Sequence, residues 1–285
     1  VLSTNNDHAY RVALDWLDAS LQVVAIADAR SNPRGALVEE ARAKGIRILT
    51  GSAVIEARGS KHVTAARVAA IDVKGHKVTS PGEWLDCDLI ASSGGYSPVV
   101  HLASHLGGKP IWREDILGFV PGEAPQKRVC VGGINGVYGL GDSLADGFEG
   151  GVRAASEAGF QAVEAVLPKA LSRLEEPTLA LFQVPHEKGT SRAPKQFVDL
   201  QNDVTAAAIE LATREGFESV EHVKRYTALG FGTDQGKLGN VNGLAIAARS
   251  LNVTIPQMGT TMFRPNYTPV TFGAVAGRHC GHIFE

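Results

Sequence analysis

The feature of the sequence that most constrains its fold is the alternation of elements in the first 49 residues. Short apolar runs at 1–4, 21–27 and 46–49 are typical of strands, and the second run is apolar except for one glutamine, as in a strand buried on both faces. Between the runs lie two segments with the apolar spacing of helices, at 8–19 and 33–44. Strand–helix–strand order of this kind requires right-handed crossovers between parallel strands. The sequence therefore predicts an α/β fold with half of a Rossmann-type unit.

The turn after the first predicted strand lacks the glycines of a dinucleotide fingerprint. It reads Ser3-Thr4-Asn5-Asn6-Asp7, where G-x-G-x-x-G would let the backbone approach a pyrophosphate. Asp28 ends the second strand, at the place where an acidic residue would hold a ribose hydroxyl. Without the glycines, we interpret Asp28 as a strand-end cap, and we expect no nucleotide at this first turn.

A different pattern follows, in which short β-rich runs alternate with turns. The segment 52–78 contains such runs at 54–57, 63–68 and 70–73, which predict a β-meander. A further strand is predicted at 88–91 and a helix at 99–106.

A glycine-rich stretch from 128 to 167 is the strongest candidate for a ligand site. It predicts a strand at 128–131, a small-residue loop at 132–142 and a helix at about 146–167. Glycines admit a phosphate close to the backbone, and the start of a helix favours an anion. The small face of the helix, formed by Ala154, Ala155, Ala158 and Gly159, is expected to pack against a sheet. A tight packing joint without a ligand is the alternative interpretation.

The rest of the chain divides at a proline-containing connector. We expect a dinucleotide-binding region at 1–167, a linker at 168–195 and a small, mostly helical domain at 196–285 that ends in an extended arm. In this last region a helix is predicted at about 204–215, capped by Asp203, with Ala207, Ala208, Leu211 and Ala212 facing inward. Further helices are expected after Ser219 and at about 242–250.

Composition and isolated motifs exclude several classes of protein. The net charge of -2 implies no broad affinity for nucleic acid or anionic membranes, and no apolar run reaches transmembrane length. Three widely spaced cysteines suit the cytoplasm and argue against a disulfide framework. His101 and His105 have metal-ligand spacing but no apparent third ligand, so we expect one satisfied and one exposed histidine. The 279–282 segment (His-Cys-Gly-His) is discounted similarly, and no residue is predicted to perform covalent or acid–base chemistry.

The motifs together resemble a known family. "SSGGYSPVVHLASHLGG" and "GGINGVYGLGDSLADG" are similar to the second half of a two-dinucleotide-binding flavoprotein. "FVDLQNDVT", "ESVEHVKRYT", "TDQGK" and "GTTMFRPNYTPV" make the chain resemble the large (alpha) subunit of heterotetrameric sarcosine oxidase over nearly its whole length. Related dehydrogenases carry a cysteine cluster for an iron–sulfur centre in this region. No cysteine lies between Cys130 and Cys280, which favours the sarcosine oxidase branch.

The resemblance implies an oxidoreductase acting on CH–NH donors. It implies NAD on this subunit, FMN between the alpha and beta subunits, FAD on the beta subunit, tetrahydrofolate on a domain outside this chain, and small gamma and delta subunits. The residues it places near NAD are Gly132, Gly133, Asn135, Gly136, Tyr138 and Leu140, and those it places at the FMN interface are Thr261, Arg264 and Thr268. Lys224, Arg225 and Lys237 are further cations that could face the FMN phosphate, although such residues are more often solvated surface charges.

The same resemblance leaves alternatives open. Flavin reductases place an acid where this chain has Ile134 or Asn135, so the loop is expected to contact only a nicotinamide nucleotide, or no ligand. The first nucleotide-binding motif should precede Val1, which is not a natural start, so the chain is expected to be a central fragment. The alternatives are the alpha subunit of another amine or amino-acid dehydrogenase, and a docking scaffold without catalytic residues.

Overall fold

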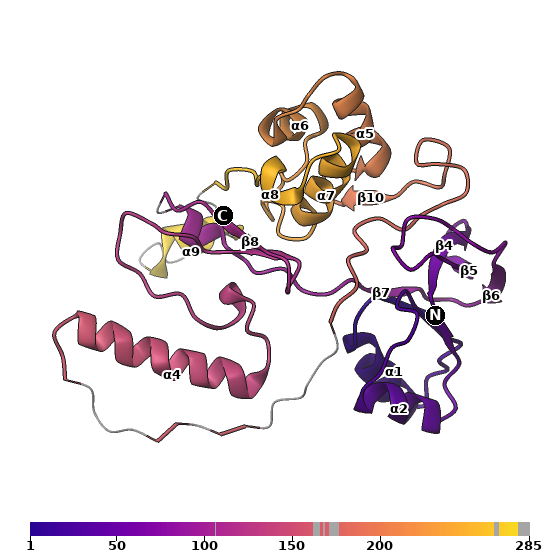
Figure 1. The fold of residues 1–285 in the computed structure, drawn as a ribbon, viewed down its shortest axis with the longest axis horizontal. Helices are drawn as coiled ribbons and strands as arrows, with labels where there is room; N and C mark the ends of the chain where they lie inside the picture. The colour runs from indigo at the N-terminus through magenta and orange to yellow at the C-terminus, as the bar shows by residue number, and fades with distance from the viewer. Residues whose placement is uncertain (106, 162–165, 168, 171–176, 265–267, 279–285) are drawn as a thin grey trace.

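A computed structural model describes residues 1–105, 107–161, 166–167, 169–170, 177–264 and 268–278 (Figure 1). Its first part is built on a four-stranded parallel sheet with the order β3-β2-β1-β7. The strands are β1 (Leu2–Thr4), β2 (Ile26–Asp28), β3 (Ile48–Thr50) and β7 (Ala91–Ser93). The predicted α/β class is therefore confirmed.

The two faces of this sheet are covered differently. On one face, α1 (His8–Asp18) and α2 (Ala36–Ala43) pack over Leu2 and Ile26, with Tyr10 and Val38 fully buried between them. The other face lies under the antiparallel meander of β4 (Ser52–Gly59), β5 (Val63–Ala70) and β6 (Glu83–Asp86). β2 is buried at all three of its residues, and burial on both faces explains why the run 21–27 that leads into it lacks apolar–polar alternation.

The meander is placed slightly differently from the prediction. The run at 70–73 forms a single bridge, between Ile71 and Val78, instead of a strand. The third strand is Glu83–Asp86, and the strand predicted at 88–91 is shifted to Ala91–Ser93, beside β1. Short apolar runs specify strand existence better than strand ends, because the ladder partner decides where pairing stops.

The predicted strand at 128–131 is wrong, because this segment is extended but outside every sheet of the described residues. The helix α4 (Leu140–Glu157) begins about six residues before the predicted start, and in Figure 1 it lies away from the parallel sheet. The small face expected to pack on a sheet is largely exposed. Within the helix only Gly150 is buried, and a Cβ there would lie 2.3 Å from Val131 Cγ1. The helix thus packs on the extended segment, with no sheet beneath it.

Between β7 and α4 the chain forms a short helix, α3 (His101–Ser104), and a hairpin of β8 (Ile111–Arg113) and β9 (Gly118–Val120). After α4, residues 177–195 of the connector are bound to the first region. Leu179 and Asn5 exchange backbone and side-chain hydrogen bonds of 3.0 and 2.8 Å. Leu179, Leu181 and Val184 also pack against a small buried cluster of Ala29, Ala53 and Ile71.

The C-terminal part contains a small hairpin, β10 (Phe197–Asp199) and β11 (Val204–Thr205), and the helices α5 (Ala206–Arg214), α6 (Val220–Thr227), α7 (Asn240–Ser250) and α8 (Ile255–Met258). They enclose a core of Ile209, Val223, Leu229, Leu244 and Ile246. The predicted Asp203 cap is wrong. Thr205 accepts the hydrogen bond from Ala208 N, so the helix starts later and turns Ala206, Ile209 and Ala212 inward.

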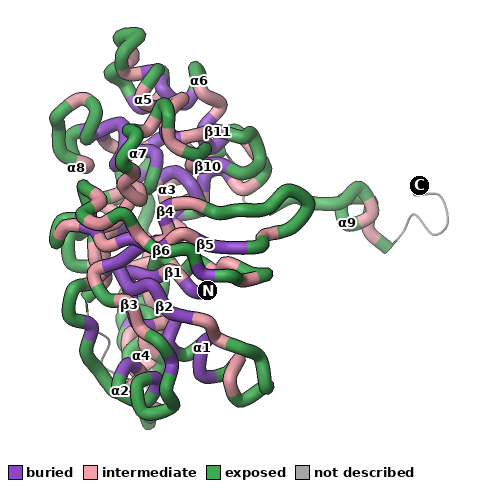
Figure 2. Tube along the Cα trace, turned by 90° about the vertical axis from the view of Figure 1, so that its right-hand side faces the viewer, coloured by how far each residue is buried: buried purple, intermediate pink, exposed green. Residues whose placement is uncertain are grey.

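Beyond α8 an arm carries α9 (Phe272–Ala276) away from the body of the molecule (Figure 2). Phe272 is 91% exposed. The 279–282 segment lies outside the described residues. Nowhere in the described ranges does a helix combine the length and the apolarity needed to cross a bilayer.

Candidate functional site

The carboxyl ends of β1 and β7 meet at the point where the strand order reverses. Open parallel sheets bind ligands in the crevice at such a point. Here polar side chains bridge the two strand ends. Asn6 Nδ2 donates to Ser93 O at 2.9 Å, Ser93 Oγ donates to Asn6 Oδ1 at 3.2 Å, and Thr4 Oγ1 donates to Ser93 O at 3.1 Å. These bonds fix the two loops against each other.

Beside this crevice, a closed network of charges holds the end of β2. The Asp28 carboxylate is completely buried and accepts hydrogen bonds from the Tyr10 hydroxyl at 2.8 Å and from Arg30 Nη2 at 2.8 Å. Arg30 also donates to Asp7 Oδ1 at 2.8 Å. The backbone N–H of Arg30 donates to Asp28 Oδ1 at 2.9 Å, which confirms Asp28 as a strand-end cap. Burial and the neighbouring Asp28 charge raise the pKa of Tyr10, so its hydroxyl remains a donor.

The glycine-rich loop begins with a 3-10 turn, η1 (Gly132–Asn135), whose polar groups are mostly engaged. Gly132 N donates to Asp146 Oδ2 at 2.6 Å, and Asn135 Nδ2 donates to Cys130 O at 2.5 Å. Gly132 and Gly136 have positive φ angles of 71° and 77°. A Cβ on Gly136 would also lie 2.4 Å from Ile116 Cδ1. These glycines are thus required by the backbone, whether or not a ligand is present.

The loop continues into an aromatic cluster at the strand ends. The Tyr138 ring centroid lies 5.3 Å from that of Tyr96, which follows β7, and Tyr96 lies 4.6 Å from His8, at the start of α1. Tyr138 is 40% exposed and Leu140 is 65% exposed. Burial, followed by the nearby Tyr96, raises the pKa of Tyr138 to about 12. The residues that the resemblance placed near NAD therefore lie together, and Tyr138 brings their loop to the switch point of the sheet.

In the C-terminal part, motifs that are distant in the sequence converge on the loop 228–240. Asp199 accepts hydrogen bonds from Gly230 N at 2.8 Å and from Gln201 N at 2.9 Å. The Gln201 side chain in turn binds Thr233 and the backbone of Asp234. The motif FVDLQNDVT thus supplies side chains that hold the loop containing the motif TDQGK.

This loop forms one wall of a cationic pocket of about 250 Å³, lined by Glu221, Lys224, Arg225, Phe231, Gln235 and Arg264. Lys224 is only 6% exposed; its ammonium donates to Met262 O at 3.1 Å and lies 5.6 Å from the Phe231 ring centroid. Glu221 accepts from Arg225 Nη1 at 2.9 Å, so its charge is paired with a different cation. Burial lowers the pKa of Lys224; the nearby Glu221 carboxylate opposes this shift, whereas the cations Arg264 and Arg225 add to it. An anion in the pocket would relieve this repulsion.

Of the three residues predicted at the FMN interface, the structure brings only Arg264 to this pocket. Thr261 is 3% exposed, and its hydroxyl accepts from Asn240 Nδ2 at 2.9 Å inside the domain. Thr268 lies exposed on the arm. Sequence reasoning missed Gln235; it named Lys224 among the cations that could face the FMN phosphate but favoured a solvated surface position for it. The signal for Lys224 was its spacing, because it follows the inward-facing Val220 by four residues and so lies on the same face of the helix.

Of the two histidines predicted as one satisfied and one exposed, His105, directly after α3, is exposed as predicted, whereas His101 has a partner for Nε2 but none for Nδ1 within the described residues. His101 is 4% exposed and its Nε2 lies 2.8 Å from Gln235 O, whereas His105 is exposed. No cluster of three metal-ligating side chains occurs in the part of the chain that the structure describes.

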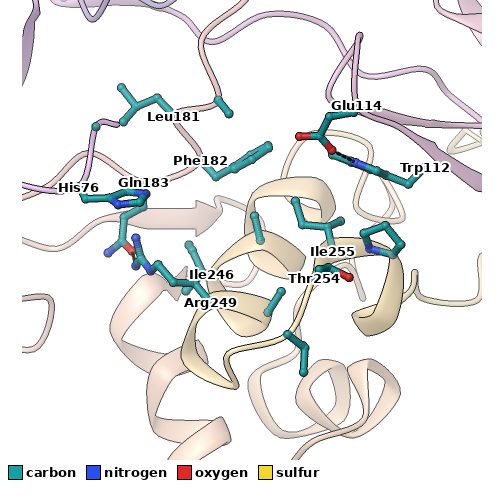
Figure 3. Close-up of a pocket in the computed structure, with 16 residues that line it drawn as sticks. His76, Trp112, Glu114, Leu181, Phe182, Gln183, Ile246, Arg249, Thr254 and Ile255 are labelled. Carbon is teal, nitrogen blue, oxygen red and sulfur yellow. Dashed lines mark hydrogen bonds between the residues drawn. The ribbon is translucent and has the colours of Figure 1, made fainter. Parts of the chain in front are cut away.

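A second pocket, of about 430 Å³, lies between the β8–β9 hairpin, the connector and α7 (Figure 3). Phe182, Ile246 and Ile255 give it apolar walls. Its polar side chains are paired with one another: Trp112 Nε1 donates to Glu114 Oε2 at 2.6 Å, and Arg249 donates to Gln183 Oε1. This pairing makes it a weaker candidate for a site that recognises a charged ligand.

Comparison with known proteins supports the resemblance read from the sequence. Residues 193–278 match the model of the sarcosine oxidase A3 domain. Over its full length the chain is 36% identical to sarcosine oxidase subunit alpha of Corynebacterium sp. (strain P-1) and 38% identical to that of strain U-96. It is also 38% identical to the subunit of Rhizobium meliloti (strain 1021) over 99% of its length. The chain spans 27–30% of the length of these relatives.

Among solved structures, the chain is similar to L-proline dehydrogenase from P. horikoshii. The TM-score is 0.59 at 18% sequence identity, over 85% of this chain and 48% of the other. At this identity the similarity concerns the fold alone.

Proposed function

Because the whole chain is homologous to sarcosine oxidase alpha subunits, we propose that it is a part of such a subunit that contributes to binding NAD and FMN. The observation that carries the proposal is the cationic pocket of the buried Lys224 and the exposed Arg225 and Arg264, which lies within the region matching the A3 domain. The complex would oxidise sarcosine to glycine at the FAD of the beta subunit, with oxygen as acceptor. Formaldehyde would pass to tetrahydrofolate on a domain outside this chain, and the small gamma and delta subunits would complete a cytoplasmic assembly.

The residues of the cationic pocket fit the phosphate group of FMN. Lys224 has three N–H donors and makes one hydrogen bond within the described residues, to Met262 O. Arg264 and Lys224 supply positive charge, while Phe231 and Gln235 supply an apolar ring and an amide. When bound, FMN would carry electrons; this chain would hold and orient its phosphate end and exclude water from it.

The loop at 132–140 fits a nicotinamide nucleotide less completely. Gly132 N and the Asn135 side chain are already engaged, which leaves the exposed faces of Gly133, Tyr138 and Leu140 for contact. A minor share of an NAD site agrees with this arrangement, since most of the polar contacts would come from a nucleotide-binding unit elsewhere.

The experiment that tests this function compares cofactor content in the complete complex. Lys224→Met should abolish or strongly reduce FMN content, whereas the exposed Lys188→Met should not change it. FMN, FAD and NAD are determined after proteolysis and chromatography, which counts free and protein-linked flavin alike. Wild-type FMN content in Lys224→Met would remove the pocket from the FMN site.

NAD is tested with Gly133→Val. A Cβ at Gly133 would meet the Tyr138 ring at 3.8 Å, an ordinary contact, and its φ is not in the left-handed region. The fold should therefore tolerate the substitution, and a loss of NAD would report on binding. Retention of NAD would exclude Gly133 from the site.

A docking scaffold is the second candidate function, and the C-terminal arm favours it. Phe272, Val275 and Val270 are 91%, 74% and 65% exposed, which is unusual for three neighbouring apolar side chains. Under this alternative the complex would assemble normally in Lys224→Met and in Gly133→Val, and this chain would bind neither FMN nor NAD in the wild type. The alpha subunit of another amine dehydrogenase remains distinguishable by its substrate.

A further inference from the structure

His101 connects the α/β region to the cationic pocket. It belongs to α3, far in the sequence from α6 and the loop 228–240. Its Nε2 lies 2.8 Å from the carbonyl oxygen of Gln235, and its ring lies 3.8 Å from that of Phe263, the neighbour of Arg264. The buried His101 side chain therefore contacts two segments of the pocket wall, the loop at Gln235 and the segment of Phe263 and Arg264.

The carbonyl that His101 binds belongs to a residue in an unfavourable conformation. Gln235 has a backbone φ of +50°, which residues with a Cβ rarely adopt, and it is 5% exposed. Such a conformation costs about 1–2 kcal/mol and persists only where the surroundings hold it. In this conformation the Gln235 side chain accepts a hydrogen bond from Arg264 N at 2.9 Å, which fixes the backbone of Arg264 at the pocket.

The hydrogen bond also determines the form of the imidazole. A carbonyl oxygen only accepts, so Nε2 must carry the proton, and Nδ1 is then an acceptor in the neutral ring. Nδ1 is buried and has no hydrogen-bond partner within the described residues. Burial lowers the pKa of His101, in agreement with a neutral donor.

We propose that His101 is a positioning residue for the anion pocket, acting through its hydrogen bond to Gln235 O and from there through Gln235 Oε1 to Arg264. The inference rests on the proposed function only in assuming that the pocket binds an anion. It assigns a role to a histidine outside the pocket and predicts that the α/β region controls the affinity of a site in the C-terminal part.

The test measures binding of inorganic phosphate to the full chain by calorimetry, with thermal unfolding in parallel. His101→Phe keeps a ring against Phe263 but loses the donor; His101→Gln keeps an N–H donor near the position of Nε2. We expect His101→Phe to weaken phosphate binding about tenfold, the effect of one lost hydrogen bond at the upper end of its range. His101→Gln should stay within about twofold of the wild type.

Amide hydrogen exchange gives a readout that does not depend on the ligand. Exchange at Arg264 N should accelerate in His101→Phe and be restored in His101→Gln. Phe263→Leu, which alters the ring stack and spares the hydrogen bond, serves as the second variant if His101→Phe unfolds, and it should bind phosphate as the wild type does.

The outcomes separate this inference from the proposed function. Equal phosphate affinity in the wild type and His101→Phe would overturn the positioning role while leaving the anion pocket intact. A loss in Phe263→Leu as large as in His101→Phe would assign the effect to the ring stack and also overturn it. No phosphate binding by the wild type would overturn both, whereas phosphate binding without FMN in the complex would contradict only the proposed function.

Discussion

The turn around Asp28 and the pocket around Lys224 both contain buried charges, but only the turn pairs them completely. At the turn, the Arg30 guanidinium bonds to both Asp28 and Asp7, and Tyr10 supplies a further donor to Asp28. At the pocket, Lys224 makes one hydrogen bond within the described residues, to a neutral carbonyl. The Glu221 carboxylate attracts it, while Arg264 and Arg225 repel it.

The difference shows how to separate structural charges from binding charges. A buried charge is tolerated when its partners satisfy it, and the Asp28 network needs nothing more. A buried ammonium with unused donors and like charges nearby is costly unless an anion binds. The sequence shows the charged residues of both regions; only their pairing in the structure distinguishes the regions.

The largest expected effect comes from opening the closed network. Arg30→Met would leave the fully buried Asp28 carboxylate without a cation, and we expect a loss of about 3–5 kcal/mol in the free energy of unfolding. Burial acts to lower the pKa of Arg30, but its hydrogen bonds to Asp28 and Asp7 outweigh burial and raise it, as expected for a strongly held guanidinium. Denaturant unfolding of the chain measures the loss.

The matched control is Arg42→Met, because Arg42 pairs with Glu39 one helical turn away and both side chains are exposed, at 41% and 64%. An exposed pair of this kind contributes less than about 1 kcal/mol. Equal losses in the free energy of unfolding for Arg30→Met and Arg42→Met would show that the buried Asp28 carboxylate does not depend on Arg30 for its stability.

A smaller effect is expected from Lys224→Met. Methionine has a similar length, removes the cost of burying the ammonium, and gives up one hydrogen bond. The free energy of unfolding should therefore change by less than about 1 kcal/mol, even though anion binding is lost. A loss above about 3 kcal/mol would show that Lys224, like Arg30, is held by partners of its own and is a structural charge.

Local patterns in the sequence predicted the parallel sheet and several helices well. Alternating strands and helices identified β1, α1, α2 and β3 within a few residues, because burial on a defined face leaves a visible spacing in the sequence. The Asp28 cap could also be predicted, since the missing glycines pointed to a side-chain role for this acid.

The predictions that proved wrong concerned features that depend on partners distant in the sequence. The segment at 128–131 has the composition of a strand, but a strand requires a neighbour to pair with, and composition cannot supply one. Of the residues predicted at the FMN interface, only Arg264 lines the pocket, and the sequence did not indicate Gln235, which lies in the loop 228–240 that Asp199 and Gln201 hold. Charge type was visible in the sequence, and charge pairing was not.

The last prediction concerns a buried group that is neither ion-paired nor exposed. His101 faces Gln235 O, with Lys237, His105 and Asp234 as the nearby charged or titratable groups. Burial lowers the pKa of its imidazole below the ordinary 6.5, and Lys237 and His105 lower it further, while the bond to Gln235 O and the Asp234 charge oppose the shift. Above this value both folded and unfolded forms are neutral, so the histidine contributes no pH dependence there.

As the pH falls below 6.5, the unfolded chain takes up the proton first, because its histidine has the higher pKa. Stability should therefore decrease with falling pH from 6.5 down to the pKa of the folded state. Since other histidines titrate in the same range, the quantity to measure is the difference from His101→Gln, which cannot titrate. Between about pH 7.5 and about pH 5, the wild type should lose up to about 1.4 kcal/mol more for each unit by which the pKa is lowered. Parallel profiles of stability against pH for the wild type and His101→Gln would contradict this prediction. They would show that the imidazole is protonated as readily in the folded chain as in the unfolded one, with its second N–H donating to an acceptor.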